Sequence, residues 1–95
     1  MSSQPIENIY LMPGLAASSK IFEHISIQND NYRLHRLDWI NPLKNESLQQ
    51  YCRRFSKKIK HKNPILIGVS FGGIIVQEID KLIYAKKVVI ISSVK

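Results

Sequence analysis

Ser70 is the residue of this chain best placed to do chemistry, because it lies in the glycine-rich segment 68–73, Gly-Val-Ser-Phe-Gly-Gly. The apolar run over 64–69 is typical of a buried strand, and apolar residues at helical spacing follow the segment. A serine on a tight turn from a strand into a helix has its hydroxyl pushed out of the sheet edge, with backbone amides nearby. This context favours covalent acyl chemistry at Ser70.

The residues around Ser70 have the types that such chemistry needs. Gly68 and Gly72 stand two positions before and two after the serine, where a Cβ would crowd a sharp elbow. The substrate oxygen that becomes negative during attack needs hydrogen-bond donors aimed at it. We expect one donor to be the N–H of Phe71, at the first turn of the following helix. The second expected donor is the N–H of Leu15, behind Gly14.

The elements that must position these residues alternate along the chain. Strands that alternate with helices predict an α/β fold, with a parallel sheet and helices on both faces. Right-handed crossovers then give the strand order 2-1-3-4. The predicted strands are 6–12, 32–37, 64–69 and 88–91. One or two helical turns are predicted at 20–25. A second helix is predicted to begin at a capping box formed by Ser47 and Gln50 and to stop at Asn63-Pro64. A third helix is predicted from the serine turn to about Tyr84.

This strand order brings two loops together at one edge of the sheet. The loop after Met12 and the turn at Ser70 leave neighbouring strands, both at their carboxyl ends. Ligands of open α/β sheets bind outside the carboxyl ends of the strands, where the strand order reverses. The sequence therefore predicts the functional site at this edge.

The last predicted strand is unusual for the end of a domain. Residues 88–91 are four consecutive β-branched apolar residues, which suit a strand that is covered on both faces. We therefore expect residues 1–95 to be a single partial domain, truncated after the strand that follows the nucleophile helix. The alternative is a chain that pairs through this last strand with a partner such as a second copy.

Composition narrows the classes of protein further. Ninety-five residues with 44% hydrophobic content make one small globular domain. Cys52 is the only cysteine, so no internal disulfide can form, and the start of the chain lacks the pattern of a signal peptide. No apolar stretch is long enough to span a bilayer, so the cytoplasm is the expected compartment. No residues have metal-ligand spacing, and we expect neither a metal nor another cofactor.

The net charge of +7 raises the question of nucleic acid as a partner. Much of this charge lies in 53–62, on and after one predicted helix. No aromatic residues alternate with these cations to stack on bases. We interpret the basic residues as a solvated helix face and expect a small-molecule acyl substrate as the partner.

Three segments together resemble the α/β-hydrolase superfamily. They are 10–15, similar to its oxyanion strand and loop, 68–72, similar to its nucleophile elbow, and 88–93, similar to the strand after the nucleophile helix. The chain resembles the N-terminal half of this fold, particularly of small serine esterases, lipases and thioesterases. The resemblance covers nearly the whole chain.

The resemblance implies a serine hydrolase that acts on a carboxylic ester or thioester. It implies a nucleophile at Ser70 and an oxyanion hole made by Leu15 and Phe71. Pro13 stands where many members of the family have histidine before the glycine, which changes only details of the loop.

The chain departs from the family in its triad. In the family an acid and then a histidine follow the nucleophile, at the ends of later strands. After Ser70 this sequence has only Glu78 and Asp80, both within the predicted helix, and it has no histidine. We therefore expect the full-length protein to supply the base, and the 95 residues alone to be nearly inactive. The histidines are His24, His35 and His61, and we expect the last two to be partnered or solvated.

Two other functions fit the same residues. The turn at 68–73 could hold an anion or a nucleotide at a helix N-terminus, or the chain could be a non-catalytic scaffold in which Ser70 caps a helix. Asp38 could contact a ligand or cap its own turn, and Trp39 could line an acyl pocket or pack in the core. Cys52 lies on an apolar helix stripe and is expected to be a core thiol.

Overall fold

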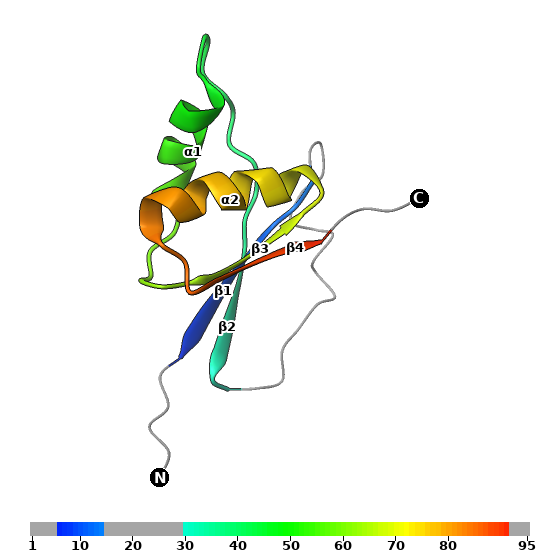
Figure 1. Cartoon of the computed structure of the whole chain (residues 1–95), viewed down its shortest axis with the longest axis vertical. Coiled ribbons are helices and arrows are strands. Elements are labelled where there is room, and N and C mark those ends of the chain that lie inside the picture. Colours follow the sequence, from blue (N-terminus) through cyan, green and yellow to red (C-terminus); the bar gives the residue numbers. More distant parts are fainter. Residues whose placement is uncertain (1–5, 15–29, 92–95) are drawn as a thin grey trace.

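The computed structural model describes residues 6–14 and 30–91, and these form a four-stranded parallel sheet (Figure 1). The strands are β1 (Glu7–Met12), β2 (Tyr32–Arg36), β3 (Ile65–Val69) and β4 (Lys87–Ile91). All three neighbouring pairs are parallel, and the order is β2-β1-β3-β4. The predicted α/β fold and strand order 2-1-3-4 are therefore confirmed.

Helix α1 (Leu48–Ser56) begins where the sequence predicts and ends earlier. The Ser47 hydroxyl accepts a hydrogen bond from the Gln50 N–H at 3.1 Å, and the Gln50 side chain accepts one from the Ser47 N–H at 2.9 Å. The prediction that the helix continues towards Asn63 is wrong. After Ser56 the N–H groups bond to carbonyls three residues back, so the chain tightens into turns; the donors are Lys57, Lys58 and Ile59.

Helix α2 (Phe71–Ile83) follows β3 directly and lies across the sheet (Figure 1). Its side chains Ile75, Val76 and Ile79 are fully buried. The helix ends at its C-cap residue Tyr84, as predicted. Tyr84 takes a left-handed conformation with φ 55°. Burial of this apolar stripe fixes the helix on the sheet and so fixes the turn before it.

The two helices of the described residues pack on the same face of the sheet, so this part of the chain does not have the predicted helices on both faces. The strand order explains this. The connection from β2 to β3 and the connection from β3 to β4 both move in the same direction across the sheet. Because both crossovers are right-handed, their helices lie on the same face. Phe55 of α1 and Ile75 of α2 share a buried core with Met12 and Leu66 from the strands. The opposite face carries its own apolar cluster around Ile9 and Leu11. The helical turns predicted at 20–25 lie outside the described residues.

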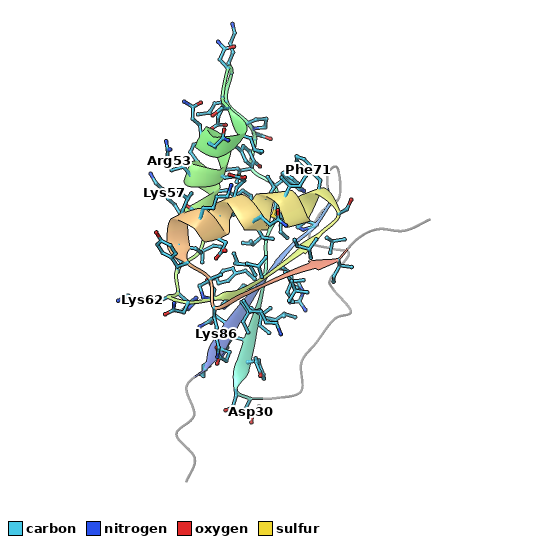
Figure 2. All side chains as sticks on the ribbon, in the orientation of Figure 1. Asp30, Arg53, Lys57, Lys62, Phe71 and Lys86 are labelled. Carbon is cyan, nitrogen blue, oxygen red and sulfur yellow. The ribbon has the colours of Figure 1, made fainter. Side chains whose placement is uncertain are left out.

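The polar surfaces of α1 and β4 follow from this packing. Arg53 and Lys57 project from α1 away from the core (Figure 2), so this part of the predicted basic face is exposed. On β4, an edge strand, Ile90 and Ile91 are 44% and 48% exposed. Within residues 6–14 and 30–91, none of the helices has the length and apolar character that crossing a membrane requires.

Candidate active site at the turn between β3 and α2

Ser70 connects β3 to α2 in a backbone conformation that serine rarely adopts. Its φ is 56° and its ψ is −121°, on the positive-φ side where a Cβ is unfavourable. Two backbone hydrogen bonds hold it there, from the Ser70 N–H to the Ile91 carbonyl at 2.8 Å and from the Gly73 N–H to the Ser70 carbonyl at 2.9 Å. Strain of this kind persists where the surrounding structure fixes the residue, which is common at functional sites.

The neighbouring glycines allow the sharp elbow that the sequence predicts. A Cβ on Gly68 would lie 2.3 Å from the carbonyl oxygen of Gly72. A Cβ on Gly72 would lie 2.6 Å from the carbonyl oxygens of both Met12 and Pro13. These neighbours are backbone atoms, which cannot turn aside as a flexible side chain can. The two glycines therefore let α2 start directly against both β3 and the end of β1.

The Ser70 hydroxyl is not used as a helix cap. Ser70 occupies the N-cap position of α2 and is exposed, yet its side chain makes no capping hydrogen bond. Ser47 holds the same position at α1 and does cap it. The interpretation of Ser70 as a capping serine is therefore wrong, because its side chain makes no hydrogen bond to the amides at the start of α2.

One of the two predicted oxyanion donors falls within the described residues. Phe71 is the first residue of α2, so its N–H has no partner inside the helix. The loop after β1 reaches the serine, since a Cβ on Gly14 would lie 3.4 Å from the Ser70 Cβ. Leu15, the second predicted donor, lies outside the described residues. The two loops that the strand order brings together thus meet at Ser70.

Trp39 and Phe71 form an aromatic pair that connects the loop after β1 to the start of α2. The Trp39 indole N–H donates to the Gly14 carbonyl at 2.8 Å. The Trp39 ring also stacks on the Phe71 ring, with 5.8 Å between centroids and 13° between planes. Figure 2 shows Phe71 at the end of α2 where the Ser70 turn lies. Trp39 therefore packs against Phe71 and the core, which is the packing role that the sequence analysis considered.

A pocket of about 430 Å³ opens beside this aromatic pair, between α1 and the start of α2. Its apolar wall consists of Trp39, Ile40, Pro42, Leu48, Tyr51, Phe71 and Ile75. Apart from Trp39, the sequence analysis missed this pocket. The helical spacing of Leu48 and Tyr51 indicated only a core-facing stripe, and tertiary contacts alone show that part of the stripe stays open.

The polar rim of the pocket is internally paired. The Glu46 carboxylate accepts from the Arg54 Nε at 2.6 Å and from its Nη2 at 2.9 Å, and Arg54 also donates to the Asn41 carbonyl. The hydrogen bonds from Arg54, with one from the Leu43 N–H, hold the pKa of Glu46 below its ordinary value. The rim therefore carries a compensated ion pair.

The described histidines lie away from Ser70. His35 on β2 is in register with Tyr10 and Leu66, and Leu66 is four residues before Ser70, or about 13 Å along the strand. His35 stacks on Tyr10, and its Nε2 donates to Asn8 at 2.8 Å. His61 is joined through Nδ1 to the Tyr10 hydroxyl at 2.6 Å. Both histidines are partnered, and His24 lies outside the described residues.

This cluster gives an expected dependence of stability on pH. Burial, then repulsion from His61 and Arg33, lowers the pKa of His35 below 6.5. The folded protein thus favours neutral His35, while the unfolded chain binds a proton below pH 6.5, so stability is lost as pH falls through this value. We expect the urea midpoint to drop between about pH 8 and about pH 5. In His35→Gln the drop is smaller, and an equal drop in both proteins contradicts the assignment.

The other candidate residues take structural positions. Cys52 is 1% exposed, and burial raises the pKa of its thiol to about 11, which confirms a core thiol. Asp38 is exposed at the end of β2. Glu78 pairs with Lys81, and the Asp80 carboxylate accepts from the Ala85 N–H near the end of α2. In the described part of the chain, no three histidine, cysteine or acidic side chains gather as metal ligands.

Comparison of the chain with protein-family models gives no match, and comparison with curated proteins gives no relative. The functional inference therefore rests on the local geometry: a strained serine whose side chain does not cap α2, the helix N–H of the next residue, and a pocket that this next residue, Phe71, lines.

Proposed function

We propose that this chain carries the nucleophile of a serine hydrolase that acts on carboxylic esters or thioesters. The observation that supports this most strongly is the conformation of Ser70, with φ 56° and a side chain that caps no amide. If Ser70 had only a structural role, no capping hydrogen bond would offset the energy of its strained backbone. A nucleophile gains an exposed hydroxyl at the edge where ligands of α/β sheets bind.

In the proposed reaction the Ser70 Oγ attacks the carbonyl carbon of the substrate, and a base takes the hydroxyl proton. The carbonyl oxygen becomes an oxyanion that accepts a hydrogen bond from the Phe71 N–H, with the Leu15 N–H as the second donor. The intermediate collapses to an acyl-serine and releases the alcohol or thiol, which takes a proton from the protonated base. Water then attacks the acyl-serine, and the acid is released.

The base is the part of this proposal that the described residues do not supply. His35 and His61 are held in the Tyr10 cluster, and Glu78 and Asp80 lie on the far turns of α2. We assign the base to a histidine outside the described ranges, with an acid that orients it. Catalysis by the site alone is then limited to what the oxyanion donors and binding provide.

Anion binding at the start of α2 would use the same free amides, and a non-catalytic scaffold would need no site. Neither accounts for a strained serine that caps nothing. An anion cradle works equally well with glycine at position 70, which would relieve the backbone. The conformation therefore favours the nucleophile.

A fluorophosphonate probe tests the proposal, because it reacts with activated serine hydroxyls. We expect the complete natural gene product to gain one adduct, which peptide mass spectrometry places on Ser70. Ser56 is a matched control, since its hydroxyl donates to the Arg53 carbonyl at 2.7 Å. Ser56→Ala should label as the original protein does, and Ser70→Ala should not label. An adduct elsewhere, or equal labelling of both variants, counts against a nucleophile at Ser70.

A further inference from the structure

We infer that the pocket between α1 and the start of α2 binds the acyl part of the substrate, and that this acyl part is uncharged and apolar. This inference rests on the proposed function, since it assigns a role to the space beside Ser70. It goes further by stating which half of the ester the pocket holds and what chemistry that half has.

The position of the pocket is the first argument. Phe71 lines the pocket and directly follows Ser70, so one residue both offers an N–H to the oxyanion and walls the pocket. Trp39 also lines the pocket, stacks on Phe71 and donates a hydrogen bond to Gly14, which approaches the Ser70 Cβ. The pocket is therefore tied to the serine through both loops that meet there. An acyl group on Ser70 stays bound through both half-reactions and is the group best served by a permanent wall.

The lining of the pocket is the second argument. Three aromatic rings and four aliphatic side chains form the wall, and a volume of about 430 Å³ lies within the range of about 300–1,000 Å³ typical of small-molecule sites. The Tyr51 hydroxyl is already committed, because it donates to the Ile40 carbonyl at 2.7 Å and accepts from the Ile40 N–H at 3.0 Å. Tyr51 thus offers a ligand the apolar surface of its ring, and its hydroxyl is already used in hydrogen bonds to Ile40.

The charge of the rim is the third argument. Glu46 lines the pocket, and its carboxylate is held by Arg54 through two hydrogen bonds. An ionic substrate group would have to compete with this pair, so the rim does not select for charge. A straight or branched hydrocarbon chain fits a wall of this kind and a paired rim.

Trp39 permits a direct binding test, because it is the only tryptophan in the chain and it lines the pocket. We would titrate the 95-residue chain with unbranched primary amides from butanamide to octanamide, which are neutral and resist hydrolysis. Trp39 fluorescence should change and saturate, with affinity rising about fourfold for each added methylene until the pocket is full. A signal that no amide changes overturns the inference.

Two leucine variants localise the binding. Leu48 is 38% exposed and opens α1, where an acidic residue is compatible with the helix dipole, so Leu48→Asp should fold. It places a charge in the apolar wall and should lower octanamide affinity about tenfold or more. Leu43 is 58% exposed and does not line the pocket, so Leu43→Asp is the matched control and should bind normally. Equal affinity in the two variants overturns the inference.

Turnover separates the acyl side from the alcohol side. In the complete natural gene product, kcat/KM for 4-nitrophenyl esters should rise with acyl length, while kcat/KM for alkyl acetates should stay nearly flat. The opposite pattern overturns the acyl assignment. If amides bind in the pocket while no ester turns over, the pocket stands and the proposed hydrolase fails, so the two failures are distinguishable.

Discussion

We expect Ser70→Ala to lower ester turnover by the complete natural gene product at least about 10³-fold, and to leave the free energy of unfolding unchanged within about 0.5 kcal/mol. Under the proposed function, turnover should fall because the nucleophile is removed, and only the oxyanion donors and substrate binding remain. Stability is unchanged because the Ser70 side chain caps no amide of α2 and alanine keeps the same backbone strain. The measurements are kcat/KM with an activated ester and urea unfolding on the same preparation.

Ser70→Gly separates strain from chemistry at the same position. Glycine tolerates a φ of 56°, so this variant should lose turnover as Ser70→Ala does and gain about 1 kcal/mol of stability. As a control for stability, Ser47→Ala removes a real helix cap and should cost about 1 kcal/mol. Two results speak against Ser70 as the nucleophile: turnover that survives in Ser70→Ala, or a loss of stability there as large as in Ser47→Ala.

Gly72→Ala has the second large expected effect, and this effect is on the fold. Its Cβ would lie 2.6 Å from the carbonyl oxygens of Met12 and Pro13, so α2 or the end of β1 must move. We expect a loss of about 3 kcal/mol in the free energy of unfolding, measured by urea denaturation, since overpacking against backbone cannot relax through side chains. The same shift moves the Phe71 N–H relative to Ser70 and should lower turnover.

Gly14→Ala is the control for that prediction, because it adds the same methyl group at the same edge. Its Cβ would meet the Ser70 Cβ and the Val69 carbonyl at 3.4 Å, which is an ordinary contact distance. We expect stability within about 1 kcal/mol of the original protein. If Gly72→Ala is as stable as Gly14→Ala, α2 does not start as tightly against β1 as we describe.

The sequence was sufficient to predict the sheet because its signals are local and regular. Apolar runs such as Ile65–Val69 identify buried strands, and the capping box at Ser47 identifies the start of α1. Crossover handedness then leaves one strand order, which the structure has. The elbow at Ser70 was also predictable, because glycines two positions before and two after a serine indicate positions where a Cβ would clash with nearby backbone.

Features that depend on contacts between distant residues were not predictable. The end of α1 at Ser56 is set by a change to tighter turns, although apolar spacing continues to Ile59. The bond from Trp39 to Gly14 and the open space beside Leu48 arise only when separate elements pack. That the Ser70 side chain does not cap α2 is likewise visible only in three dimensions, since the sequence does not distinguish a capping serine from one that does not cap.

The pairing of β1 with β3 also determines when the site can exist during folding. Residue 10 pairs with residue 66, so more than half of the chain lies between the two strand segments that must meet. Parallel pairing between distant segments makes folding slow, because a large loop must close before contacts compensate its entropy. Gly14 approaches Ser70 only once that register has formed. Assembly of the site is therefore a late event in folding, simultaneous with closure of the centre of the sheet.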